Sequence, residues 1–160
     1  KLLTALQQAI EGKVVAKGEH FFLKNSQGEL EFTLLAEGMR KLALVWLLIQ
    51  NGTLSSGSVL FWDEPEANLN PSLIGQVVET ILELQRLGVQ VFLTTHNYVV
   101  LKEFDLRQKK GDAIRYISLF RDEQTAVVAN TSDSYASIGP NLIADTFSDL
   151  YDRELKRNLG

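Results

Sequence analysis

The stretch that decides the fold runs Val59-Leu60-Phe61-Trp62-Asp63-Glu64-Pro65-Glu66. Its four apolar residues are typical of a buried β-strand, and the proline after the acids ends that strand. Carboxylates at the carboxyl end of a strand stand where open α/β sheets bind ligands. Two like charges in one site repel each other, and Mg²⁺ with a phosphate relieves that repulsion. The stretch predicts a metal ligand, Asp63, beside a general base, Glu64; the structural alternative is a solvated strand end and turn.

The segments that follow predict a parallel sheet. A helix is expected from about Pro71 to Leu87, with proline at its start and Gly88 just past its end. Another strand, 89–93, leads to His96. Strand, helix, strand and helix with short connections favour parallel strands, whose carboxyl ends meet at one edge. We therefore expect His96 and the acid pair at the same edge of the sheet.

The rest of the chain predicts helices and antiparallel hairpins around this unit. The expected elements are a helix end over 1–11, a hairpin or meander of strands 14–16, 21–23 and 30–34 with a turn at 25–28, a helix over 37–50 that is buried on every side at 42–49, a short helix over 97–104, a hairpin of strands 114–120 and 125–129 across 121–123, and an amphipathic helix over 141–155.

Size and composition indicate a globular protein. The 160 residues predict a single domain, 1–160. The chain has no cysteine, which excludes thiolate metal sites and favours a cytoplasmic location. A net charge of −4 gives no overall footprint for nucleic acid, and no apolar run is long enough to span a membrane. The sequence begins at Lys1 without a methionine, and we expect a fragment or a processed chain.

Two further groups could bind phosphate, each with a structural alternative, and a third segment has a predicted structural role. Gly38 and Arg40 lie at a predicted helix start, where backbone N–H groups favour anions; solvated Arg40 and Lys41 are the alternative. The imidazole of His96 could contact a terminal phosphate, or it could serve as a capping residue. Asn70 is predicted to be a helix N-cap whatever else its loop does.

Together, in this order and spacing, these elements resemble the C-terminal half of an ABC-type ATPase head. The branch that they resemble is the SMC and RecF-like ATPases, with the AAA-type ATPases related to the OLD family. Residues 35–40 match that family's signature loop, 59–64 its Walker B motif, 65–71 its D-loop, and His96 its switch histidine. The resemblance implies a P-loop NTPase-like α/β fold: an N-terminal helix end and β-hairpin (1–35), a signature helix (36–52), and a parallel-sheet core with a C-terminal helix (53–160).

The resemblance also implies cofactors, partners and residue roles. ATP and Mg²⁺ are the implied cofactors, with Asp63 on the metal, Glu64 on the attacking water and His96 on the γ-phosphate. The implied nucleotide-binding residues are Glu37, Gly38 and Arg40, which complete the site of the opposite subunit, and Asn68 and Asn70, which lie along the dimer contact. Such heads close as a homodimer around two ATP molecules. DNA as a partner is implied by the resemblance alone, and no membrane is expected.

The sequence departs from the family pattern in two places. Ala36 replaces the usual signature serine, so one hydroxyl contact to phosphate is lost. More importantly, the Walker A pattern G-x-x-x-x-G-K-[ST] has no match: the Gly12-Lys13 step is followed by Val14 and has Gln7 five residues before Gly12. The chain therefore lacks the amide cradle and lysine for the β- and γ-phosphates.

Three hypotheses remain open. The first is the C-terminal part of an ATP-hydrolysing head, inactive by itself, with the Walker A segment on a preceding segment or a separate chain. The second is a degenerate ABC-like module that dimerises or binds a partner without hydrolysis. The third is a Mg²⁺-dependent phosphatase or nuclease using Asp63, Glu64 and Glu66. We rank it lowest because no second acidic cluster follows strand 89–93.

Overall fold

The computed structural model describes residues 2–121 and 126–159, and it divides into two compact units, Lys1–Thr95 and His96–Gly160. Each unit is described by itself. Lys1 and residues 122–125, which include most of the predicted 121–123 turn and the start of the predicted 125–129 strand, lie outside the described residues. The expectation of one domain over 1–160 stays a prediction.

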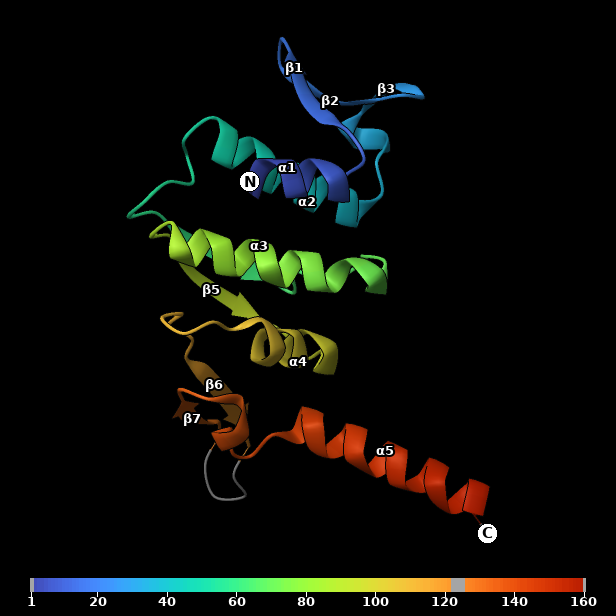
Figure 1. Cartoon of the computed structure of the whole chain (residues 1–160), viewed down its shortest axis with the longest axis vertical. Coiled ribbons are helices and arrows are strands. Elements are labelled where there is room, and N and C mark those ends of the chain that lie inside the picture. Colours follow the sequence, from blue (N-terminus) through green and yellow to red (C-terminus); the bar gives the residue numbers. More distant parts are fainter. Residues whose placement is uncertain (1, 122–125, 160) are drawn as a thin grey trace. The chain divides into compact units, whose positions relative to one another are not determined.

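The first unit opens with a helix and an antiparallel meander. Helix α1 (Leu2–Ala9) precedes β1 (Lys13–Lys17), β2 (His20–Asn25) and β3 (Gly28–Glu31), which pair in the order β1-β2-β3 (Figure 1). This confirms the predicted meander and its turn at 25–28. The prediction that the last strand reaches residue 34 is wrong, because residues 32–34 form the 3₁₀ turn η1 (Phe32–Leu34). That turn brings the Phe32 ring to 5.9 Å from the ring of Phe21, a contact that packs the chain against the meander.

The core of this unit lies where three helices meet. Helix α2 (Glu37–Gln50) has the predicted bounds, and α1 packs against both α2 and α3 (Ile74–Arg86). Large side chains from these helices are fully buried: Leu6, Leu42, Val77, Leu82 and Leu84. The prediction that α2 is buried on every side is wrong, since Leu44 is 49% exposed. A helix has one stripe of positions facing a core, and α2 turns its other positions outward although they too are apolar.

The parallel unit is confirmed. Strands β4 (Val59–Asp63) and β5 (Gln90–Thr94) pair in parallel, and the connection between them contains the 3₁₀ turn η2 (Pro71–Leu73) and α3. Figure 1 shows β5 running alongside α3, which packs on it. The prediction that β4 is a buried strand is wrong, because its residues are alternately exposed and half-buried. Phe61 is 76% exposed and stacks on Phe92 at 5.0 Å between ring centroids. Parallel sheets are normally covered on both faces, and here the exposed face carries a pair of stacked rings.

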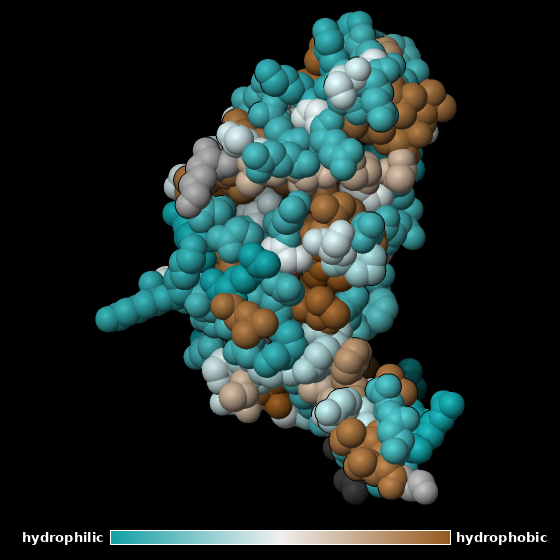
Figure 2. Space-filling model, turned by 45° about the vertical axis from the view of Figure 1, so that its right-hand side comes forward, coloured by the Kyte–Doolittle hydropathy of each residue, from teal (hydrophilic) through white to brown (hydrophobic). Residues whose placement is uncertain are grey.

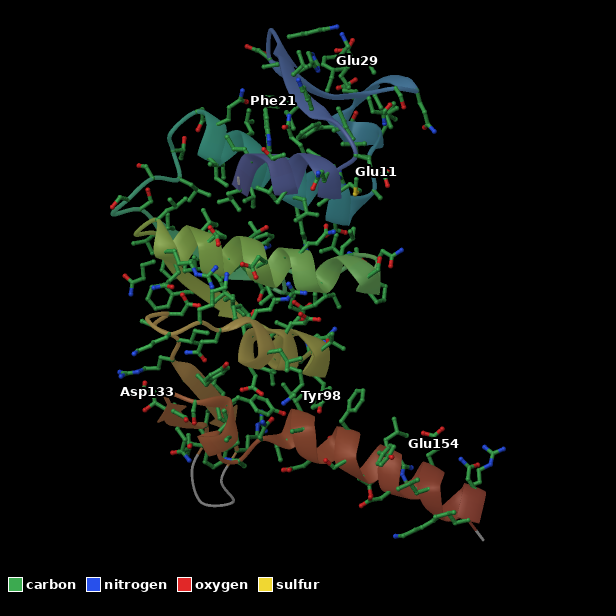
Figure 3. The ribbon with its side chains drawn as sticks, in the orientation of Figure 1. Glu11, Phe21, Glu29, Tyr98, Asp133 and Glu154 are labelled. Carbon is green, nitrogen blue, oxygen red and sulfur yellow. The ribbon has the colours of Figure 1, made fainter. Side chains whose placement is uncertain are left out.

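The second unit contains a short helix, a hairpin and a long terminal helix. Helix α4 (Tyr98–Arg107) is followed by β6 (Tyr116–Phe120), β7 (Val128–Ser132), η3 (Tyr135–Ser137) and α5 (Leu142–Leu159). The hairpin is confirmed, but its second strand lies at 128–132 and not at 125–129, because Phe120 pairs with Val128 and Tyr116 with Ser132. The side chain of Tyr98 stacks on Phe147 of α5 at 4.2 Å between ring centroids (Figure 3).

Apolar side chains also reach the surface. Figure 2 shows hydrophobic patches set among hydrophilic side chains on the face that it presents. Large exposed apolar residues include Phe61, Leu106, Leu119 and Leu159. Among the described residues, no helix is both long and apolar enough to cross a membrane.

Candidate functional site

The ends of β4 and β5 are joined side by side. Asp63 is the register partner of Thr94, and the Thr94 hydroxyl donates a hydrogen bond to the Asp63 carboxylate. The next backbone N–H, that of Glu64, donates to the Thr94 carbonyl at 3.1 Å, which carries the ladder one residue beyond the strand. Asp63 is exposed. A carboxylate is therefore held in a fixed position at the open edge of the sheet, where α/β proteins bind ligands.

After Asp63 the chain enters a tight loop, residues 64–70, here termed the acid-pair loop. Its backbone is left-handed at two non-glycine residues, Glu64 (φ 42°) and Asn68 (φ 62°). Such conformations are uncommon, cost on the order of 1–2 kcal/mol per residue, and persist only where the surroundings hold them. Internal hydrogen bonds run from Ala67 N to Glu64 O at 3.0 Å and from Leu69 N to Glu66 O at 3.1 Å. The loop is thus a compact, strained turn.

The first turn of α2 packs directly on the acid-pair loop. The Asn68 amide donates to a Glu37 carboxylate oxygen at 2.7 Å. Gly38 is buried against the same residue, and a Cβ at this position would lie 2.6 Å from the Asn68 carbonyl oxygen. Lys41 reaches the loop from the next turn and donates to the Glu64 carbonyl at 3.3 Å. The structure therefore brings together Glu37, Gly38, Asn68 and the acid pair within one unit.

Two other predicted residues have different positions. Arg40 lies on α2 with an exposed side chain. Asn70 is also exposed, and its predicted role as a cap is confirmed: its side-chain oxygen accepts from Ser72 N at 3.0 Å and from Ser72 Oγ at 2.9 Å. The helical segment that it caps begins as the 3₁₀ turn η2, with Pro71 at the first position.

Glu66 faces the interior of the unit. It is only 8% exposed, and one carboxylate oxygen accepts from Thr95 Oγ1 at 2.5 Å. The other oxygen is buried with no hydrogen-bond partner among the described residues. Glu66 ties the acid-pair loop to the end of β5, so its burial does not suit the role of an open metal ligand that the phosphatase or nuclease hypothesis gives it.

Sequence reasoning missed three residues that shape this site: Lys41, Thr94 and Thr95. The two threonines follow a parallel strand, and polar residues at that position are a signal that could have been used. Lys41 was expected to be a solvated lysine at a helix start. Its side chain is 25% exposed, and its contacts on the loop lie 23 and 26 residues away in sequence. No local pattern could have revealed them.

His96 begins the second unit and is exposed. It does not cap α4; the neighbouring Asn97 does, accepting from Val99 N at 2.8 Å. Within this unit, a hollow of about 500 Å³ is lined by His96, Asn97, Tyr98, Leu142, Ile143, Thr146 and Phe147. The expectation that His96 joins the acid pair at one edge stays a prediction.

The donor set fits one kind of metal site. Among the residues that the structure describes, no group of three or more His, Cys, Asp or Glu side chains is arranged to hold a metal ion. Magnesium does not require such a cage, because it commonly binds through one or two carboxylates and completes its shell with water and substrate phosphates. Asp63, exposed and fixed beside Glu64, fits that mode.

The structure thus combines a parallel β4–α3–β5 unit, an acid pair at the strand end, and a glycine-containing helix start packed on the following loop. Together with the comparisons that follow, these features show that it is an ABC/AAA-type ATPase-like domain. A solved chain from a study of "ATP-driven dimerization and DNA stimulated activation of SMC ATPases" has the same fold, with a TM-score of 0.57 and 9% identity over 95% of this chain and 92% of that one. The chain belongs to the family described as "AAA domain, putative AbiEii toxin, Type IV TA system", whose model matches residues 4–102.

A curated relative supports the same class. The "L-cystine import ATP-binding protein TcyN" of Bacillus subtilis (strain 168) is 32% identical over 75 residues, which is 47% of this chain. The match spans 25% of that relative, so this chain corresponds to about a quarter of its length.

Proposed function

We propose that this chain is the C-terminal part of an ATP-hydrolysing head and that its phosphate-binding loop is supplied by another segment. The observation that carries the proposal is the acid pair at the end of β4: Asp63 is bonded to Thr94, and Glu64 opens the strained loop held by α2. In this reading residues 59–64 act as the Walker B motif and 65–71 as the D-loop. The missing G-x-x-x-x-G-K-[ST] pattern is the reason to assign the phosphate cradle elsewhere.

The proposed chemistry needs little more than positioning. Mg²⁺, when bound, neutralises phosphate charge. Asp63 holds it, and the Thr94 hydroxyl fixes the orientation of that carboxylate. Glu64 orients the attacking water and accepts its proton, while His96 contacts the γ-phosphate. Phosphoryl transfer is catalysed mainly by such placement and by charge stabilisation, so these groups suffice once the phosphates are cradled.

We further propose that two copies close head to head around ATP. Glu37, Gly38 and Arg40 then complete the partner's nucleotide site, and Asn68 and Asn70 lie along the contact. Arg40, Asn68 and Asn70 are exposed, as this role requires. Ala36 offers no capping oxygen to the first turn of α2, which leaves that helix start suited to a phosphate. The solved SMC ATPase is described as dimerising in an ATP-driven manner.

A complementation assay tests this proposal. The chain alone is expected to hydrolyse ATP negligibly and to bind nucleotide weakly. Mixed with, or fused to, the segment that carries the phosphate-binding loop, it is expected to gain Mg²⁺-dependent turnover that Asp63→Asn removes. Robust, Glu64-dependent turnover by the isolated 160 residues would contradict the proposal.

The second candidate is a degenerate module that dimerises without hydrolysis, and Ala36 together with the missing loop favours it. In the same assay this candidate predicts ATP-dependent association of the complemented protein with no turnover. The intact Glu64 argues for the first candidate, because a site that does not hydrolyse ATP has no need of a base.

A further inference from the structure

The backbone of Glu64 is held from both sides in a conformation that it would rarely adopt alone. Its φ of 42° is left-handed, which persists in a non-glycine residue only where the surroundings determine it. On one side, its N–H donates to the carbonyl of Thr94 at 3.1 Å and approaches the Thr94 hydroxyl at 3.4 Å. On the other side, its carbonyl oxygen accepts from the Lys41 ammonium at 3.3 Å.

Lys41 is well matched to this position. An ammonium has three donors and no acceptor. The Lys41 Nζ lies 3.3 Å from the Glu64 carbonyl, 3.5 Å from the Ala67 carbonyl and 3.8 Å from a Glu37 carboxylate oxygen. The Ala67 N–H itself donates back to the Glu64 carbonyl at 3.0 Å. Lys41 therefore closes the turn that begins at Glu64, and its half-buried side chain shields these contacts from solvent screening.

The direction of the Glu64 side chain follows from its backbone, because φ and ψ fix where the Cα–Cβ bond points. The Glu64 carbonyl accepts from the Ala67 N–H within the loop and from the Lys41 ammonium, which reaches it from α2. The same helix turn carries Glu37, which accepts from Asn68, the second left-handed residue of the loop. Two strained positions of the acid-pair loop are thus held by one turn of α2.

We propose that Lys41 is a positioning residue for hydrolysis: its ammonium holds the Glu64 carbonyl and thereby aims the carboxylate that activates water. This inference rests on the proposed function of Glu64. It also links two sites of the proposed dimer, because the α2 turn assigned to the partner's nucleotide is bonded to the base that serves the protomer's own nucleotide. A shift of α2 is transmitted to Glu64 through Lys41.

The test compares Lys41→Met, Lys41→Arg and Lys41→Gln in the head completed with its phosphate-binding segment. Lys17→Met is the matched control, because Lys17 lies on β1 in an exposed ion pair with Glu29 at 2.6 Å. Lys41→Met is expected to lower kcat by roughly tenfold or more while the KM for ATP changes by less than about twofold, since misplacement of a catalytic group affects the transition state more than binding. Lys41→Arg is expected to recover part of kcat, and Lys17→Met to behave as the unmodified protein.

A second readout does not depend on turnover. Hydrogen exchange at the Ala67 amide is expected to speed up by roughly tenfold or more in Lys41→Met. Exchange at the Val89 amide, which donates to Leu84 at 3.0 Å away from the loop, is expected to stay unchanged. If Lys41→Met does not fold, Lys41→Gln serves for both measurements.

Two results would overturn the inference: an unchanged kcat in Lys41→Met, or a fall in kcat that matches an equal fall in the number of ATP-binding sites. A different variant, Glu64→Gln, tests the proposed function independently of Lys41. If Glu64→Gln retains full turnover, Glu64 is not the base; if Glu64→Gln is inactive while Lys41→Met is fully active, only the role of Lys41 is wrong.

Discussion

Gly38 is the residue at which packing leaves the least freedom. A Cβ there would lie 2.6 Å from the Asn68 carbonyl oxygen and 2.6 Å from Leu69 Cδ2, and the carbonyl belongs to backbone that cannot rotate away. We expect Gly38→Ala to destabilise the protein by about 1–3 kcal/mol, because α2 must move off the acid-pair loop. Denaturant unfolding measures this change.

Leu44→Ala on the exposed side of the same helix is the control for Gly38→Ala, and it is expected to alter the free energy of unfolding by less than about 0.5 kcal/mol. Equal stability of Gly38→Ala and the unmodified chain would mean that α2 does not pack on the loop as described.

Tyr116 makes the stability of the second unit depend on pH. Burial, and after it the charge of Asp105, raises the pKa of Tyr116 to about 12. The unfolded pKa is about 10, so the folded state binds the phenolic proton more tightly. Below pH 10 the phenol is neutral in both states and adds no pH dependence, whereas between about pH 10 and 12 the unfolded state loses its proton first, and the protein loses about 2 kcal/mol of stability.

The Tyr116→Phe variant tests this account. The hydroxyl is buried without a hydrogen-bond partner among the described residues, so its removal at pH 7 is expected to be neutral or stabilising by up to about 1 kcal/mol. Unfolding measured between pH 9 and 12 should lose stability less steeply in the variant, with a remainder from Tyr135, whose pKa burial also raises. The same pH slope in both proteins would contradict the assignment.

At this scale, the sequence predicted the residues whose signals are local. Asp63 and Glu64 were expected at the end of a strand, and Asn70 was expected as a cap, and both placements are confirmed. Lys41 could not be predicted, because its contacts depend on how α2 crosses the loop and not on any nearby residue.

At the scale of elements, the start of the η2–α3 segment depends on Asn70. Its side chain accepts from both the backbone and the hydroxyl of Ser72. Asn70→Ala is expected to cost about 1 kcal/mol and to lower Tm by a few degrees, whereas Asn70→Ser should retain most of the stability. Thermal unfolding without nucleotide separates this capping role from the proposed dimer contact. An unchanged Tm in Asn70→Ala would show that the cap does not stabilise the helix.

Sequence patterns predicted the order of the helices and strands better than their burial and register. Local alternation and turn residues predicted the meander, the parallel pair and their order. Leu44 and Phe61 were expected in the interior and are exposed. An apolar residue in the sequence favours burial, but the sequence does not show whether another element covers it. The second hairpin strand was misplaced by three residues, since its register is set by cross-strand pairs such as Phe120 with Val128.

At the scale of the whole molecule, the chain carries the acid pair, the threonines bonded to Asp63 and Glu66, and the α2 turn, and its sequence has no match to the pattern G-x-x-x-x-G-K-[ST]. The family match reaches from residue 4 to residue 102, so it includes His96 together with the first unit. In the proposed function, another segment completes this head and hydrolysis depends on Glu64.

The most direct test is single-turnover hydrolysis of ATP by the completed head, with and without Glu64→Gln. Glutamine keeps the shape of the side chain and cannot accept the proton of water. We expect ATP to bind the variant about as tightly as the unmodified head, while the hydrolysis rate falls by roughly 10²-fold or more. Hydrolysis at an unchanged rate in Glu64→Gln would contradict the central claim.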